Sequence, residues 1–482
     1  MTAALVLLIF AAGAAAMATR RLPALLALPA MALAIGGLEL LLGGLTVAEF
    51  TRSVVSDGAT RLSEAATVIL LGGILSAHLQ RTGVAQSIVR RGAEFAGESA
   101  LLVVLMLMAV VAVLFTTITG LGALVLVGTI VLPILASLGI PTHVAASSVL
   151  FGACLGGLLN PANWTLYTNV LGLQPTMVSG FAVQLVAVTA LGALLFCAFE
   201  LARARLLRIR IAALVPVFVG IALVAASVYA FRALPAAATE AIVVALRWLL
   251  GIMLPFAAFS TLLHRLRLSP AEGERVSGAS LWIPAVPLCA ILLFSWPPLA
   301  AFLAGIGYAI AVTWRRGAIQ LFVRSCLEGG TGVMPALLLL VGLGMLLNAI
   351  LGPSQGIGRP WPVLAHVQPL FTSLVPSSTL GYVLTFGALA PLALYRGPLN
   401  VWGLGYPIAG ALLAAQMPAG SIMAMLLSVG ILQSVSDPTN TANVWIANEA
   451  RVDVGTLLRR TLPWTWGIAI LGLLLAARSF FA

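Results

Sequence analysis

Apolar stretches long enough to cross a bilayer recur along almost the whole of this 482-residue chain. Each runs for roughly 18 residues or more, which as a helix spans about 30 Å of hydrocarbon. Because 61% of the residues are hydrophobic and only 8% are charged, the apolar surface far exceeds what the core of one soluble domain can bury. The sequence therefore predicts an all-α integral membrane protein.

The basic residues indicate which ends of the spans face the cytoplasm. All 25 of them are arginines, and cytoplasmic turns carry an excess of such residues. The net charge of +11 therefore needs no nucleic-acid partner, and we expect a multi-pass protein of the inner, cytoplasmic membrane. With the N-terminus outside, the cytoplasmic side receives the arginine-rich turns at 20–21, 81–91, 203–210, 265–275, 315–316 and 451–460.

The predicted spans divide into two halves, separated by a polar junction with Pro and Gly at 269–280. The first span is read as a membrane helix rather than a removed signal, because no basic region precedes it. A polar, proline-bearing loop is expected at 352–379. Simple spans are expected near 4–17, 22–45, 65–77, 177–201, 211–231, 240–263, 281–294 and 299–314.

An internal repeat relates the halves. F-T-R-S-V-V-S-D-G at Phe50–Gly58 and F-V-R-S-C-L-E-G-G at Phe322–Gly330 share Phe, Arg, Ser and the final Gly at an offset of 272. About five spans in each half, with two between them, give about 12 in all, and an odd number per half makes the repeats inverted. Further along, an offset of 277 pairs Gly120 with Gly397, Pro141 with Pro418, Asn160 with Asp437, Pro161 with Pro438 and Asn163 with Asn440.

The repeat defines the predicted domain organisation. A first inverted repeat covers 1–202 and a second covers 281–482, with two connecting helices at 203–280. Each repeat is divided into scaffold helices, at 1–97 and 281–379, and a hairpin with a broken helix, at 98–202 and 380–482.

Each half is predicted to contain a re-entrant hairpin. Apolar residues at Ala100–Phe115 give way to T-T-I-T-G-L-G-A at Thr116–Ala123 and resume to about Leu138. Each limb is short for a relaxed crossing, and a small, hydroxyl-rich tip suits two half-helices that meet inside the membrane. Two thin spanning helices are the alternative. The repeat places the second tip at 395–400.

Two interrupted helices carry the most informative polar residues. N-P-A-N at Asn160–Asn163 and D-P-T-N at Asp437–Asn440 both lie within long apolar runs. A carboxylate, a proline and amides are costly in hydrocarbon and are tolerated mainly where a helix is interrupted beside a protein-lined cavity. Matching interruptions in two halves predict the binding site of a secondary transporter.

Asp437 stands apart from the other acidic residues, because nearly all of the 14 acids lie at predicted helix ends or in connectors. A carboxylate in the middle of a membrane takes up a proton or holds a cation, and either behaviour provides ion coupling. Asp437 is equally suited to cap the half-helix that begins after Pro438, by accepting hydrogen bonds from free N–H groups. One residue can serve in both roles.

Arg396, at the second predicted tip, is the candidate for binding an anion. A guanidinium clamps a carboxylate bidentately, and half-helix N-termini nearby add favourable potential. The alternative is a loop arginine that faces water or a lipid phosphate. Arg247 lies in a connecting helix, where snorkelling or a bond between helices is expected instead of substrate contact.

Uncharged polar side chains cluster at the tips and breaks, where they offer donors and acceptors to a carboxylate or a cation, although such groups also satisfy broken backbone. The four Cys and four His lack metal-ligand spacing, so neither a metal site nor a catalytic residue is predicted. The predicted coupling-ion site is Asp437, Asn160 and Ser436. The predicted substrate site is Thr117, Thr119, Gly120, Asn160, Asn163, Arg396, Asn400, Thr439, Asn440 and Asn443.

The order of these features resembles the citrate-proton symporter family and the related gluconate permeases of the ion transporter superfamily. Two apolar helices, an F-x-R-S piece, a hairpin with a small-residue tip, a G-I-P turn, an N-P or D-P break and a closing helix carry the likeness, which covers almost the whole chain. The resemblance implies scaffold and transport domains built from inverted repeats, often in a homodimer. It also implies that an organic anion moves with protons or Na⁺ by an elevator-like motion.

The tips depart from the pattern of the citrate carriers. Those carriers have an acidic D-G-D-G-like first tip, where this chain has T-I-T-G-L-G at Thr117–Gly122. Their second tip tends to S-N-D, where this chain has R-G-P-L-N at Arg396–Asn400. The loss of acids and the gain of an arginine argue against a metal–citrate complex and favour a free carboxylate.

These features together predict a symporter for a small organic acid such as a carboxylate, driven by protons or Na⁺, with no cofactor other than Na⁺ as a candidate coupling ion. The alternative is a cation/proton or arsenite-type antiporter of the same superfamily, which needs Asp437 in the cavity and has no use for an arginine there. A membrane enzyme is not expected, because no paired carboxylates, metal cluster or nucleophile with its base occurs at credible spacing.

Overall fold

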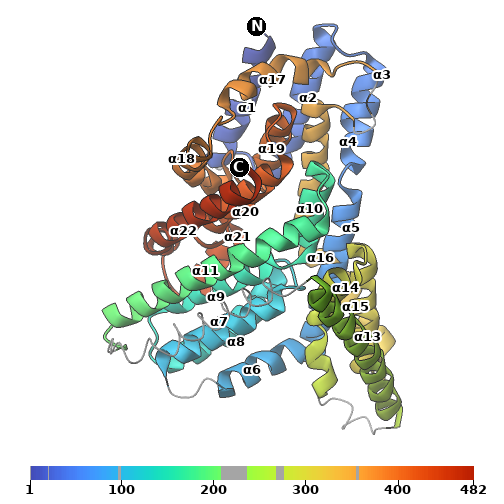
Figure 1. Cartoon of the computed structure of the whole chain (residues 1–482), viewed down its shortest axis with the longest axis vertical. Coiled ribbons are helices and arrows are strands. Elements are labelled where there is room, and N and C mark those ends of the chain that lie inside the picture. Colours follow the sequence, from blue (N-terminus) through green and yellow to red (C-terminus); the bar gives the residue numbers. More distant parts are fainter. Residues whose placement is uncertain are drawn as a thin grey trace.

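The described chain is built of helices, with no strand among the residues placed by the computed structural model (Figure 1). Those residues are 2–19, 21–95, 99–207, 236–267, 276–353, 356 and 358–481. The predicted helix at 211–231, most of the predicted junction, and Arg20, Arg208, Arg210 and Arg275 lie outside them.

Six helices in the described part of the chain are long and apolar enough to cross a membrane, and one bent pair of helices adds a seventh. Hydrophobic side chains stand on the outer surfaces of several of them, including Leu246, Trp248 and Phe256, as a lipid-facing surface requires. The protein is therefore embedded in a membrane. The six long helices are Ala24–Leu41, Val47–Arg81, Pro175–Arg203, Glu240–Arg267, Ala318–Leu351 and Val454–Phe481.

Two of these helices are much longer than a bilayer requires. The predicted separate piece at Phe50–Gly58 is in fact part of a 35-residue helical run, Val47–Arg81. Thr46 starts this run with a capping box, in which its hydroxyl accepts from Glu49 N and the Glu49 carboxylate accepts from Thr46 N. No proline follows before Arg81, so nothing stops the helix at the polar residues that suggested a break. The run consists of α3 (Val47–Glu49), the π-helical η1 (Phe50–Ser56), α4 (Asp57–Thr60) and α5 (Ser63–Arg81).

The second long helix, α16 (Ala318–Leu351), includes the matching stretch Phe322–Gly330 and packs along the first. Glycines let the two backbones touch: a Cβ on Gly73 would lie 2.7 Å from the Gly329 carbonyl oxygen, and a Cβ on Gly58 would lie 2.8 Å from Met345 Cα. Gly344 in turn lies against the Gly58 carbonyl. The two crossings join Gly58 to Gly344 and Gly73 to Gly329, so the glycines have the same spacing on both helices.

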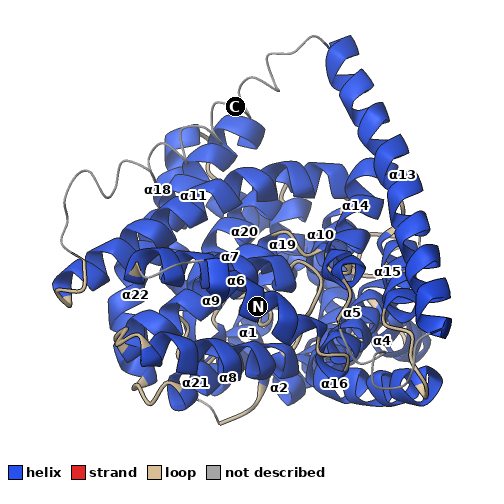
Figure 2. Cartoon of the chain, turned by 90° about the horizontal axis from the view of Figure 1, so that it is seen from below, coloured by secondary structure: helices blue, strands red, loops and turns tan. Residues whose placement is uncertain are grey.

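Helices peripheral to this pair complete one side of the molecule. The α13 helix lies at its edge beside α14 and α15 (Figures 1 and 2). The expected loop at 352–379 is only partly a loop, because α17 forms within it and buries Val363 and Val367. These helices are α1 (Thr2–Ala18), α2 (Ala24–Leu41), α6 (Val84–Phe95), α13 (Ala236–Arg267), η3 (Gly278–Trp282), α14 (Ala285–Phe294), α15 (Pro298–Val312) and α17 (Pro362–Leu374).

The remaining helices form the other side, and they include the predicted hairpins and broken helices. In the first half, α7 (Ala100–Phe115) and α8 (Leu121–Ser137) flank the first tip, and α9 (Thr142–Leu158) bends by 52° into α10 (Pro161–Leu171). The elements that the predicted repeat would match to these in the second half are α18 (Thr379–Leu389), η4 (Ala390–Arg396), α19 (Gly405–Ala414), α20 (Ala419–Val435) and α21 (Thr441–Glu449). The closing helices are α11 (Pro175–Arg203), α22 (Val454–Ala476) and η5 (Ala477–Phe481).

The two sets of elements exchange contacts in a reciprocal way. The second arm of the first hairpin, α8, packs on the half-helix α21, while α19 packs on the half-helix α10. Gly128 lies against Trp445 in the first contact, and the rings of Tyr167 and Tyr406 meet at 5.6 Å in the second. The helical segments that precede the two breaks, α9 and α20, also contact one another. Both broken helices are thereby brought to the middle of the molecule.

Candidate functional site

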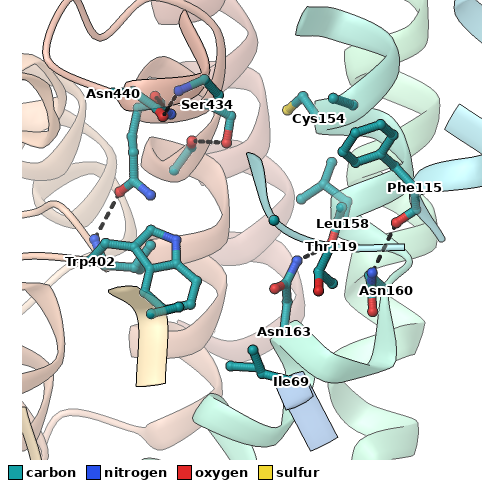
Figure 3. Close-up of a pocket in the computed structure, with 18 of the residues that line it drawn as sticks. Ile69, Phe115, Thr119, Cys154, Leu158, Asn160, Asn163, Trp402, Ser434 and Asn440 are labelled. Carbon is teal, nitrogen blue, oxygen red and sulfur yellow. Dashed lines mark hydrogen bonds between the residues drawn. The ribbon is translucent and has the colours of Figure 1, made fainter. Parts of the chain in front are cut away.

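A cavity of about 430 Å³ lies between the two broken helices (Figure 3). Its lining comes from both sides of the molecule: the first hairpin tip, α9 and α10 on one wall, α20, α21 and the segment after the second tip on the other, and α16 between them. Figure 3 shows Thr119, Asn160 and Asn163 across the cavity from Trp402, Ser434 and Asn440.

At the first break, Asn160 joins the broken helix to the hairpin tip. Its side-chain oxygen caps α10 by accepting from Ala162 N at 3.0 Å, and Pro161 occupies the first turn, where a missing N–H costs nothing. Its side-chain nitrogen donates to the carbonyls of Phe115 (3.0 Å) and Ile118 (3.2 Å) at the end of α7. The side chain is 1% exposed, so all these bonds are made away from water.

At the second break, Asp437 joins the broken helix to the second tip. Whereas Asn160 donates to the first tip, Asp437 accepts hydrogen bonds from the second. One carboxylate oxygen accepts from the backbone N–H groups of Tyr395 (3.0 Å) and Thr439 (2.9 Å) and from the Thr439 hydroxyl (2.7 Å). The other accepts from the Asn400 amide at 3.3 Å. Asp437 is 1% exposed and does not line the cavity. The carboxylate therefore holds the second tip against the break by accepting from neutral donors.

Most of the side-chain amide oxygens that line the cavity already accept a hydrogen bond from a backbone N–H. The oxygen of Asn440 caps α21 by accepting from Ala442 N at 3.0 Å, and the oxygen of Gln433 accepts from Val401 N at 2.8 Å. A backbone N–H can only donate, so these contacts fix which end of each amide is the oxygen. Together with Asn160, three of the four cavity amides thus turn their acceptors toward backbone.

What remains free is mainly N–H. Asn163 donates one amide hydrogen to the Gly157 carbonyl (2.8 Å), and Asn440 donates one to the Gln433 carbonyl (3.1 Å), which leaves each a second hydrogen. The Gln433 side-chain nitrogen and the Trp402 indole N–H have no partner among the described residues. The buried Thr119 hydroxyl, on the opposite wall, also lacks a partner in the described part of the chain. The cavity is therefore rich in hydrogen-bond donors.

None of the described residues that line the cavity carries a charge. Arg396 lies outside it, half-buried, with a left-handed φ of 55°, and makes no hydrogen bond or ion pair with the residues that the structure describes. Nor does any described group of three His, Cys, Asp or Glu side chains lie close enough to hold a metal ion. The site offers a ligand neutral donors and apolar surface.

The predicted site residues thus divide into two groups. Thr119, Gly120, Asn160, Asn163 and Asn440 line the cavity. The others lie outside the cavity. Thr117, at the first tip, donates to Leu114 O, and Arg396 is at the second tip. Asn400 and Thr439 bond the Asp437 carboxylate, Asn443 donates to Asp437 O, and Ser436 bonds Thr461 and Thr465.

Sequence reasoning missed several lining residues. Gln433 and Ser434 belong to the interrupted stretch but precede its break by several residues, and Trp402 follows the second tip. Pro335, within α16, lines the cavity together with its neighbour Val333. The proline inside this long apolar helix was the one feature of the sequence that could have indicated an irregularity beside the cavity.

The chain matches no known protein-family model, and no curated protein matches it.

Proposed function

We propose that this protein is a secondary active transporter, a symporter that carries a small organic acid anion in the cavity between the two helix breaks. The observation that supports this most is the surplus of N–H donors in the cavity, because a carboxylate accepts hydrogen bonds through both of its oxygens. A cation would need oxygen ligands, and three of the four amide oxygens already accept one backbone hydrogen bond, which leaves each a single lone pair. The antiporter alternative is correspondingly less favoured.

The transporter architecture proposed here consists of two inverted repeats with about 12 spans and two re-entrant hairpins. Support comes from the equal glycine spacing on the two long helices and from the reciprocal packing of α8 on α21 and α19 on α10. The arms α7 and α8, of 16 and 17 residues, are short for full crossings. The glycine contacts favour pairing Gly58 with Gly329 and Gly73 with Gly344, at an offset of 271, in place of the pairing of Gly58 with Gly330 at 272 that the sequence suggested. A π-helix inserts one extra residue, so η1 would account for the change from the offset of 272 at Phe50.

Asp437 is proposed as the residue that senses the coupling ion. A proton on the oxygen that faces Asn400 would set an O–H donor against the Asn400 amide N–H, and the loss of charge would weaken the bonds that the other oxygen accepts from Tyr395 and Thr439. Both changes would loosen the second tip from the break. A Na⁺ ion would act on the same oxygens by competing with these donors. By contrast, Asn160 holds the first tip through bonds that no proton alters at ordinary pH.

The remaining parts of the proposal follow from the family resemblance. The ion transporter superfamily, and within it the citrate-proton symporters and gluconate permeases, supplies the expectation of scaffold and transport domains that move relative to each other. It also supplies the homodimer, the coupling to protons or Na⁺ and the location in the inner membrane.

Uptake by proteoliposomes tests the function. Radiolabelled mono-, di- and tricarboxylates are offered under imposed proton or Na⁺ gradients, with protein-free liposomes as background. We expect gradient-driven uptake of an acid, lost in Gln433→Glu, which keeps the acceptor for Val401 N but replaces a donor with a negative charge. Gln320→Glu, on the exposed start of α16, is the matched control and should leave uptake unchanged. Gradient-driven cation exchange without acid uptake would refute the proposal.

A further inference from the structure

The composition of the cavity also limits the charge and shape of the acid, if the proposed transport function holds. We propose that the substrate is a monocarboxylate with an apolar body, and that di- and tricarboxylates are excluded. Three properties of the lining carry this: the absence of charge among its described residues, the number of free donors, and the apolar surface that surrounds them.

A second carboxylate would find no compensating charge. Moving an ionised carboxylate out of water is strongly unfavourable unless it is paired or fully hydrogen-bonded. Arg396 lies outside the cavity, and Asp437, though also outside it, adds a negative charge just behind the second break. A dianion or trianion would therefore be bound without any neutralising partner and close to a like charge.

The free donors match the needs of one carboxylate. Its two oxygens have about four lone-pair sites. These donors are the second amide hydrogens of Asn163 and Asn440, the Gln433 amide and the Trp402 indole N–H, all of them on residues that line the cavity. Figure 3 shows Asn163 on one wall and Asn440 and Trp402 on the other. Several of these donors suffice for one carboxylate, but they are too few to solvate two or three.

Most of the remaining cavity surface is apolar, apart from the hydroxyl groups of Tyr167, Tyr406, Ser434 and Thr441. Beyond the polar groups at the breaks, the ligand would contact aliphatic side chains of α8, α9, α10, α16 and α20 and the ring of Tyr406. An apolar body gains from such contact roughly 0.8 kcal/mol, or about fourfold in affinity, for each buried methylene. The aliphatic residues include Leu124, Leu150, Leu158, Leu166, Val333 and Ile431.

Equilibrium binding to the purified full-length protein in detergent tests the inference without interference from passive membrane permeation. Radiolabelled hexanoate and adipate form the matched pair, since both have six carbons and differ in a second carboxylate. Butyrate supplies the chain-length comparison and citrate the higher charge. Binding to Gln433→Glu is subtracted as background, because this variant is expected to repel an anion.

We expect hexanoate to bind at least tenfold more tightly than adipate, and citrate not to bind. Because butyrate has two fewer methylenes, its affinity should be lower than that of hexanoate by a factor of roughly ten or more. Asn163→Arg adds a positive charge to the cavity wall and should shift the preference toward adipate. Adipate or citrate binding as tightly as hexanoate would overturn this inference and leave the transport proposal standing. Binding of no acid at all would overturn both.

Discussion

Replacing Asp437 with asparagine tests whether this carboxylate holds the second hairpin tip to the helix break. An asparagine oxygen can keep the bonds from Tyr395 and Thr439, but its amide nitrogen then faces the Asn400 nitrogen across the present 3.3 Å contact. Two donors would oppose each other in a buried place, which leaves at least one of them without a partner at a cost of about 1–3 kcal/mol. Loss of charge assistance in the other bonds adds to this.

We therefore expect Asp437→Asn to lower the free energy of unfolding by about 2–4 kcal/mol. Asp437→Ala should cost more, because it leaves the Tyr395 and Thr439 donors and one Asn400 amide hydrogen unpaired, while the other Asn400 hydrogen keeps its bond to Ala393 O. The matched control is Asp453→Asn at the exposed start of α22, where the side chain accepts from Thr456 N at 2.8 Å. Asparagine caps a helix as well as aspartate does, so this change should be nearly neutral.

Unfolding can be followed by titration with SDS in mixed micelles, with a thiol-reactive dye as the probe. Cys197 is fully buried and becomes reactive only when the helices separate. Cys154 lines the cavity and Cys289 and Cys326 are half-buried, so these three are replaced by serine in every variant compared. If Asp437→Asn were no less stable than Asp453→Asn, the carboxylate would not be held by these donors, and its assignment as the link between tip and break would be wrong.

Two further predictions concern the long helices and the second tip. Gly73→Ala should destabilise the protein by about 1–3 kcal/mol in the same titration, because its Cβ would collide with the backbone of the facing helix, whereas Gly467→Ala on α22 has open space and should be neutral or stabilising. Arg396→Gln should retain acid uptake in proteoliposomes, since Arg396 lies outside the cavity; complete loss of uptake with normal folding would return the anion to the second tip.

The positions of the helix breaks could be predicted from sequence because they depend on local chemistry. Asn160 with Pro161, inside an apolar run, stops one helix and caps the next, and the bend of 52° follows there. The same signal indicated the second break at Asp437. The long helix from Val47 to Arg81 was missed because its polar residues suggested a separate amphipathic piece before the span at 65–77, whereas the capping box at Thr46 starts a helix that continues through them.

The direction of each side chain was beyond the reach of the sequence. A polar residue in an apolar run is recognisable, but the run does not show whether its side chain enters a cavity or turns back to the backbone. Asp437 and Asn440 stand three positions apart, yet one bonds the second tip and the other lines the cavity. The contribution of α16 was equally hidden, because Val333 and Pro335 reach the cavity only through tertiary packing.

The contrast between Asn160 and Asp437 has a consequence for how the two halves can work. Both residues occupy the same place in the predicted repeat and both join a predicted hairpin tip to a helix break, but Asn160 donates to carbonyls while Asp437 accepts from N–H groups. Of these two side chains, only Asp437 can take up a proton. In a proton-coupled symporter built from two similar halves, the first tip would therefore be held at all ordinary pH values, and the coupling proton would act on the second alone.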